Sequence, residues 1–305
     1  MWPSWRKEHQ RIIRVLQQHN NTRQPLPGLS DSKSLETLAW QIVASLRREA
    51  YYNLVQKKKV SSRRADPNRS HFDAERAVAY FVQTNQLEEA AWLIFLMTHF
   101  AKPEESGWLR LKDVYGKLGT GRWTWKEVKS DPSDFQRWLA QNWQQIRGKF
   151  GNHRKYESLR PSSNRDTSSV VASYLSWVGP QGQIAHFNKL VRTLGNDPHT
   201  IFDGFYHDLK VKSFGRLAKF DFLSLLGRYQ VVPMDAGSAY LSGATGPLAG
   251  VRLLFDGKRD GNSSIDQLQT RLDLLDKDLK VSMKVLEDAL CNWQKSPKKF
   301  VHFKG

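Results

Sequence analysis

The sequence contains a single cysteine and no long apolar run. Cys291 alone can form neither an internal disulfide framework nor a zinc site built from cysteine thiolates. No stretch approaches the roughly 18 consecutive apolar residues that a membrane-spanning helix needs. Residues 1–14 also lack the apolar core of a secretory signal. We therefore expect a cytoplasmic protein that makes no contact with a membrane.

Acidic residues are few in comparison with basic ones. Among 305 residues, 30 Asp and Glu stand against 47 Lys and Arg, which gives a formal net charge of +17. Such an excess of positive charge indicates nucleic acid or another polyanion as the partner. A hydrophobic content of 39% is too high for a disordered chain, so this charge is carried by a folded protein.

Strand-like alternation is absent as well, and apolar residues recur at helical spacing, as in Leu35, Leu38, Ile42 and Leu46. The sequence therefore predicts an all-α fold of two lobes. The expected divisions are an N-terminal extension over residues 1–30, a helical lobe over residues 31–160 and a second lobe over residues 161–305. Helices are expected at residues 72–83, 87–100, 168–178, 183–194, 198–209, 215–227, 236–241 and 264–292, and a further one starts at Asp131 and Pro132.

Neither a metal site nor a cofactor is expected. The nine histidines show no ligand spacing on a shared helix face, although a structural cation held by backbone carbonyls stays open. Residues 57–69 carry six Lys and Arg side chains against Asp66 alone. This basic loop is either a solvated surface or an arm that contacts phosphates.

The most informative segment runs from Val211 to Tyr240. It predicts a helix end, a short hairpin, a buried helix, an apolar turn, and Asp235 at the start of the next helix. A glycine-bearing hairpin before a helix N-terminus exposes backbone N–H groups that can hold one DNA phosphate. The residues expected to contact the DNA backbone are Lys212, Ser213, Phe214, Gly215, Arg216 and Lys219.

This segment resembles the helix-hairpin-helix of the DNA glycosylase superfamily that includes endonuclease III and 8-oxoguanine glycosylase. The turn that ends in Asp235 is similar to the family's apolar turn before its catalytic aspartate. The hairpin departs from the family pattern, because Lys212–Gly215 stands where Leu-Pro-Gly-Val-Gly is usual. The resemblance implies a two-lobed, helical, glycosylase-like fold with Asp235 as the catalytic residue.

The same resemblance implies a monofunctional enzyme. In bifunctional members a lysine nucleophile precedes the aspartate by 18 or 19 residues, and the residue 18 positions before Asp235 is Leu217. Leucine cannot form a Schiff base, and Lys219 lies on another face of the helix. Water would therefore attack the sugar at C1′. Two alternatives stay open: Asp235 caps the following helix, or Asp221 is the catalytic carboxylate.

A second resemblance covers residues 75–255. The segments that carry this resemblance are Thr98–Lys102, Gly107–Arg110, Tyr115–Gly119, Trp123–Trp125, Phe150–Leu159, Phe214–Leu223 and Gly243–Pro247. These strings resemble the α-glutamyl/putrescinyl thymine pyrophosphorylase family, a glycosylase-related group associated with phages, mobile elements and hypermodified DNA bases. Some relatives act as antiphage glycosylases that excise a glucosylated hydroxymethylcytosine. The resemblance implies double-stranded DNA with modified bases as the partner.

An enzyme that removes such a base must flip it out of the duplex and stack it, for which aromatic and Arg side chains are suited. The candidates for binding the base are His99, Trp123, Trp125, Asn152, His153, Arg154, Lys155 and Tyr156. For the tryptophans and for His99, a place in the core is the alternative.

Three functions follow from these patterns. The leading one is a monomeric, monofunctional DNA glycosylase that excises a modified pyrimidine, for which a glucosylated hydroxymethyl base is expected, in antiphage defence. The second is an enzyme that displaces pyrophosphate from an activated thymine during base hypermodification. The third is a non-catalytic helix-hairpin-helix protein that binds DNA.

Overall fold

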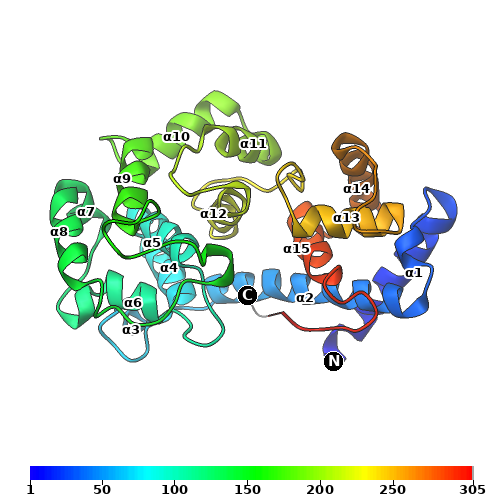
Figure 1. The fold of residues 1–305 in the computed structure, drawn as a ribbon, viewed down its shortest axis with the longest axis horizontal. Helices are drawn as coiled ribbons and strands as arrows, with labels where there is room; N and C mark the ends of the chain where they lie inside the picture. Colours follow the sequence, from blue (N-terminus) through cyan, green and yellow to red (C-terminus); the bar gives the residue numbers. More distant parts are fainter. Residues whose placement is uncertain (304–305) are drawn as a thin grey trace. The chain divides into compact units, whose positions relative to one another are not determined.

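The computed structural model describes residues 1–303, and these residues form helices without a β-strand. The predicted all-α class is therefore confirmed. The described chain divides into two compact units (Figure 1). Unit 1 combines residues 1–51 with residues 236–303, and unit 2 is the continuous stretch 52–235. These divisions differ from the expected ones at residues 30 and 160.

Unit 1 is built from both ends of the chain. Its elements are η1 (Pro3–Trp5), α1 (Arg6–Thr22), η2 (Pro27–Leu29), most of α2 (Ser32–Lys57), α13 (Gly246–Asp256), α14 (Ile265–Leu279) and α15 (Met283–Trp293). Ile12 and Leu16 of α1 are fully buried in one apolar cluster with Ile42, Leu272 and Trp293. The first 30 residues are therefore part of this core and do not form a separate extension.

Unit 2 surrounds helix α5 (Leu87–Phe100). All residues from Ala90 to Phe100 are buried, which is typical of a helix covered on all sides. The other elements are α3 (Ser62–Ala65), α4 (Ala74–Gln83), α6 (Leu109–Tyr115), η3 (Lys117–Gly119), α7 (Trp125–Ser130), α8 (Pro132–Asn142), η4 (Asn152–Arg154), α9 (Thr167–Val178), α10 (Gln183–Leu194), α11 (Pro198–Asp208) and α12 (Arg216–Arg228).

Two predicted helices are wrong. Residues 236–241 are irregular, with Gly237 inside them and Tyr240 at a φ of 45°, and the next helix begins only at Gly246. The helix expected over residues 264–292 is two helices, because Lys280 and Ser282 have φ values of 55° and 84°. There the Asp276 carboxylate accepts hydrogen bonds from the N–H groups of residues 281 and 282 and stabilises the break.

The basic stretch 57–69 contains a short helix, α3, which Ser61 caps by accepting from the Arg63 N–H. Asp66 forms ion pairs with Arg69 at 3.5 Å and with Arg122 at 3.2 Å. This segment is therefore attached to the rest of unit 2, while Lys57, Lys58 and Lys59 are exposed.

None of the helices in residues 1–303 combines the length and the apolar character that crossing a membrane requires.

Candidate functional site

Helices α11 and α12 are joined by a tight hairpin over residues 209–215. Ser213 has a φ of 65°, and the Phe214 N–H donates to the Val211 carbonyl at 3.1 Å. The Ser173 hydroxyl of α9 accepts from the Lys212 N–H at 2.8 Å. The structure thus contains a helix-hairpin-helix at the predicted place.

The outer side of this hairpin is open. Lys212 and Gly215 are exposed, and a Cβ placed on Gly215 would meet no atom within 4 Å. Gly215 is the N-cap of α12 and supplies no side-chain acceptor to the first N–H groups of that helix. An anion can therefore approach the α12 N-terminus.

The two remaining basic candidates of the hairpin differ in their surroundings. The Lys219 ammonium donates to the Tyr206 carbonyl at 2.9 Å, and burial, with the nearby Lys210 charge, lowers its pKa. The Arg216 guanidinium lies 4.8 Å from the centre of the Phe220 ring. Lys219 is thus engaged with α11, and Lys212 is the most exposed of the three cations.

A buried arginine connects the hairpin to the linker around residue 154. Arg154 is only 6% exposed. Its Nη1 donates to the Ser213 carbonyl at 2.7 Å, and its Nε donates to the His99 carbonyl at 3.3 Å. Its guanidinium also lies 5.0 Å from the centre of the Phe214 ring. Four of the predicted site residues, His99, Arg154, Ser213 and Phe214, are therefore brought together.

Carboxylates balance this buried charge. Glu157 lies 3.5 Å from the Arg154 Nη2, with its own side chain fully buried, and it also pairs with Arg165. Burial lowers the pKa of Arg154, while the charges of Glu157 and Asp221 raise it. The sequence reading missed Glu157, although its spacing of three residues from Arg154 is the signal that could have found it.

His99 lies in the core of unit 2. Its ring is fully buried between Phe95, Phe100 and Phe150, and its Nε2 is 3.0 Å from the Thr167 hydroxyl. Burial and the Arg154 charge hold its pKa well below the usual value, so the ring is neutral. These contacts match the alternative of a core histidine.

The two tryptophans of the glycine loop are also buried, at 2% and 4% exposure. Trp123 packs against Phe135, with ring centres 5.3 Å apart, and the Lys117 ammonium lies 3.9 Å from its ring centre. The backbone N–H of Trp125 donates to the Glu89 carboxylate at 2.9 Å. Trp123 is thus a core residue, whereas Trp125 also reaches a pocket.

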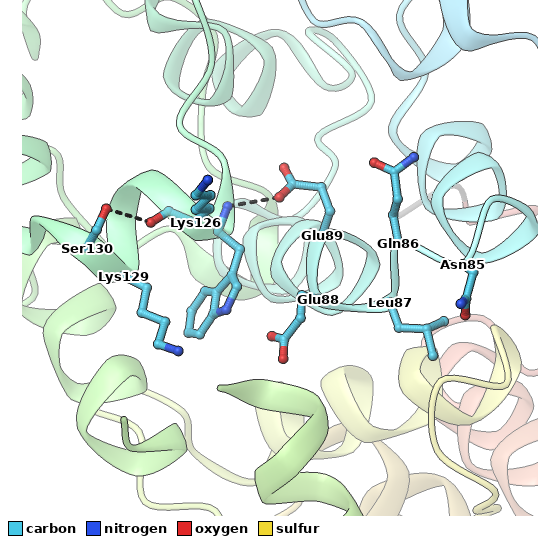
Figure 2. A pocket seen from close by; sticks show the side chains of 9 residues that line it. Asn85, Gln86, Leu87, Glu88, Glu89, Lys126, Lys129 and Ser130 are labelled. Atoms are coloured by element: carbon cyan, nitrogen blue, oxygen red, sulfur yellow. Dashed lines mark hydrogen bonds between the residues drawn. The ribbon is translucent and has the colours of Figure 1, made fainter. Parts of the chain in front are cut away.

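That pocket, called here the α5–α7 pocket, has a volume of about 590 Å³. Figure 2 shows α7, with Lys126 and Lys129, beside the first turn of α5. The lining residues used below are Leu87, Glu88, Glu89, Trp125, Lys126 and Lys129.

The other linker candidates are on the surface. Asn152, His153, Lys155 and Tyr156 are exposed, and Tyr156 reaches 70% exposure. The Lys155 ammonium lies 5.1 Å from the centre of the Tyr156 ring. An aromatic ring this exposed can stack on a base.

Asp235 contacts the first two residues of α11. The Asp235 N–H donates to the Pro198 carbonyl at 3.2 Å, and the His199 Nδ1 is 3.1 Å from the Asp235 carbonyl oxygen. No helix follows directly, because α13 begins at Gly246 with Thr245 as its N-cap. The alternative that Asp235 caps the following helix is therefore wrong.

Asp235 is also far from the hairpin. The preceding Met234 packs its carbonyl against Gly227 near the C-terminal end of α12, whereas the hairpin lies at the N-terminal end. At 1.5 Å per residue, the 12 steps from Gly215 to Gly227 span about 18 Å. Of the two candidate aspartates, Asp221 is the one whose charge acts on Arg154, where it raises the pKa of the guanidinium.

The residues from 1 to 303 contain no group of three or more His, Cys, Asp and Glu side chains that could hold a metal ion.

Comparison with known proteins gives a family for almost the whole chain. The family model described as alpha-glutamyl/putrescinyl thymine pyrophosphorylase clade 3 matches residues 33–305. Searches of curated proteins and of solved structures found no match. The resemblance to this family is confirmed, and the likeness to helix-hairpin-helix glycosylases stays a prediction.

Proposed function

Because the chain belongs to the alpha-glutamyl/putrescinyl thymine pyrophosphorylase clade 3 family, we propose that it is an enzyme that acts on modified pyrimidines in DNA. The proposed reaction is hydrolysis of the bond between the base and the sugar, as in a monofunctional DNA glycosylase. In a bacterial cytoplasm this reaction would damage phage DNA that carries a glucosylated or otherwise enlarged pyrimidine.

The observation that carries this proposal is the helix-hairpin-helix, with its open backbone face and its fixed conformation. Lys212 and the α12 N-terminus offer a phosphate contact. Arg154 holds the Ser213 carbonyl from inside the protein. Such a hairpin binds the DNA backbone without contacts that depend on the DNA sequence. This suits an enzyme that recognises the flipped base instead.

In the proposed mechanism Asp235 directs a water molecule. The water oxygen bonds to C1′ as the bond from C1′ to the base nitrogen breaks. The base leaves with the bonding electrons and takes up a proton, and Asp235 accepts a proton from the water. The carboxylate also stabilises the positive charge that develops on the sugar. The product is an abasic site in an uncut strand, because no lysine follows the hairpin at Leu217.

Asp235 suits this role better than Asp221 for an electrostatic reason. Asp221 lies close enough to the buried Arg154 for its charge to raise the Arg154 pKa. The same guanidinium therefore offsets the charge that Asp221 could offer to a cationic transition state.

The test is to incubate the protein with phage DNA of known base modification and to measure abasic sites and the released base. We expect release by the wild type and a loss of at least about 100-fold in Asp235→Asn. Asp221→Asn is the matched control and should lose less. If Asp221→Asn is inactive and Asp235→Asn is active, the assignment of the catalytic residue is wrong.

The family name supports a second candidate, displacement of pyrophosphate from an activated thymine. Release of pyrophosphate while the base stays on the DNA would favour this reaction over base removal. Duplex binding without any product, equal in wild type and Asp235→Asn, would instead favour a DNA-binding protein without catalysis.

A further inference from the structure

The α5–α7 pocket is not used by the proposed function. Its volume of about 590 Å³ lies within the roughly 300–1,000 Å³ that small-molecule sites have. Its residues come from the first turn of α5 and from α7 (Figure 2).

The two carboxylates of the pocket are already engaged by the protein. Glu88 accepts hydrogen bonds from the Gln183 N–H at 3.0 Å and from the Ile184 N–H at 3.2 Å, at the start of α10. Glu89 accepts from the Tyr115 hydroxyl at 2.5 Å and from the Trp125 N–H at 2.9 Å. Both oxygens of each carboxylate therefore have a donor, which argues against a cationic ligand.

The two lysines of the pocket are not engaged. Lys126 and Lys129 are exposed, and within residues 1–303 neither ammonium group has an ion pair or a hydrogen-bond partner. Glu127, which stands between them, is occupied by the N-cap of α7 and by Lys117 at 3.6 Å. Among the charged groups that line the pocket, the two ammonium groups are therefore the ones that are free to bind a ligand, and they favour an anionic group.

The walls of the pocket add an apolar and aromatic surface. Leu87 lies at the start of α5, and Trp125 is the first residue of α7. Trp125 is only 4% exposed, so it adds a small apolar area to the wall that Leu87 forms. An apolar wall near two free ammonium groups suits a ring that carries a phosphate. We propose that the α5–α7 pocket binds a nucleotide, with the base against Trp125 and Leu87 and the phosphate at Lys126 and Lys129.

This site is distinct from the proposed reaction centre. Glu88 contacts the first residue of α10, whereas Asp235 contacts the first residue of α11, the helix that follows α10 in the chain. The 12 residues of α10 span about 18 Å, which is too far for one nucleotide to reach both places. The pocket is therefore a second nucleotide site, and it goes beyond the proposed function.

The experiment is isothermal titration calorimetry of the full-length protein with thymidine 5′-monophosphate. We expect saturable binding, at least about tenfold weaker binding in the double variant Lys126→Glu/Lys129→Glu, and weaker binding of thymidine, which lacks the phosphate. Ser130→Trp, which fills the pocket without changing its charge, should also abolish binding. Circular dichroism melting checks that both variants are folded.

The matched control is Lys7→Glu/Lys33→Glu, which changes the net charge equally at two residues that do not line the pocket. It should bind like the wild type. Equal weakening in this control would overturn the proposal, since the effect would then come from net charge alone. Failure of the monophosphate to bind, or equal binding of thymidine, would overturn it as well.

A single-stranded oligothymidylate distinguishes the source of the nucleotide. If its affinity also falls in Lys126→Glu/Lys129→Glu, the site takes a nucleotide within a DNA strand. If only the free monophosphate depends on these lysines, the site takes a free nucleotide. Both results support a nucleotide site. Calorimetry does not require base release, so the proposed glycosylase can fail while this site stands.

Discussion

At the scale of single residues, Arg154 is the side chain on which the candidate site depends. The Ser213 carbonyl and the His99 carbonyl come from segments 59 and 55 residues away in the chain, and Arg154 hydrogen-bonds to both. A buried guanidinium with these partners fixes the hairpin conformation, including the left-handed Ser213.

Replacing Arg154 tests whether this side chain acts by fixing the hairpin conformation or only by its positive charge. We expect Arg154→Met to lower the free energy of unfolding by about 3 kcal/mol, because it removes one partner of a buried ion pair and leaves two carbonyls unsatisfied. Duplex affinity should fall as well. Urea unfolding and a DNA titration measure the two effects.

Arg160→Met is the control for this prediction, because Arg160 belongs to the same linker and is exposed. Its unfolding free energy should change by less than about 0.5 kcal/mol. If Arg160→Met and Arg154→Met weakened DNA binding equally while both stayed stable, Arg154 would act through its charge and not through the hairpin.

At the scale of elements, the close approach of α12 to the Asp235 turn is the critical contact. A Cβ at Gly227 would lie 2.3 Å from the Met234 carbonyl oxygen, so only glycine lets this turn pack against the helix. The turn then places Asp235 beside the first residues of α11.

We expect Gly227→Ala to displace this turn. The helix propensity gained, about 1 kcal/mol, is smaller than the cost of moving a backbone carbonyl, and a net loss of about 2 kcal/mol in unfolding free energy should result. Base release should fall more steeply than duplex binding, because the hairpin is untouched. Chemical unfolding and the abasic-site assay measure these effects.

Gly215→Ala provides the comparison, since its Cβ would meet no atom within 4 Å and its φ of −73° suits any residue. Its unfolding free energy should change by less than about 1 kcal/mol. A stable and fully active Gly227→Ala would mean that the Asp235 turn is not held by this contact.

The helices were largely predictable because their signals are local. Apolar spacing and the N-caps Asp131 and Asp197, each followed by proline, mark the starts of α8 and α11. The hairpin was found for the same reason. Residues 236–241 were wrongly predicted as a helix because the buried Ala236 and Ala239 have a helical spacing of three residues, whereas Gly237 and the left-handed Tyr240 determine the backbone.

At the scale of the whole molecule, the predicted lobes did not include the packing of residues 1–51 with residues 236–303 in one unit. Hydrophobic spacing shows that α1 and α15 each need an apolar partner, but it carries no information on which helix that is. The contacts between Arg154 and the hairpin were missed in the same way, because they join residues far apart in the chain.

The pairing of the chain ends can be tested by truncation. Deletion of residues 1–30 removes the buried Ile12, Leu16 and Leu26 from the unit 1 core. At about 1.5–3 kcal/mol for each buried side chain, the loss should exceed about 5 kcal/mol. Limited proteolysis should then cut residues 236–303 before residues 52–235.

A deletion variant that melts like the full chain and resists proteolysis would show that the first 30 residues are an appendage after all. The structure gives the opposite expectation, because the Arg11 guanidinium also donates to the Leu279 carbonyl at 2.9 Å.

Because unit 1 contains residues from both sides of unit 2, the two units fold in a fixed order during synthesis on the ribosome. Residues 52–235 can fold as soon as they have been synthesised, whereas α1 must wait for α14 and α15, which leave the ribosome after all of unit 2. During synthesis the apolar face of α1 is therefore unprotected. Completion of unit 1 depends on closing a loop that contains all of unit 2, so this step should be the slow phase of folding and the one in which a chaperone is most useful.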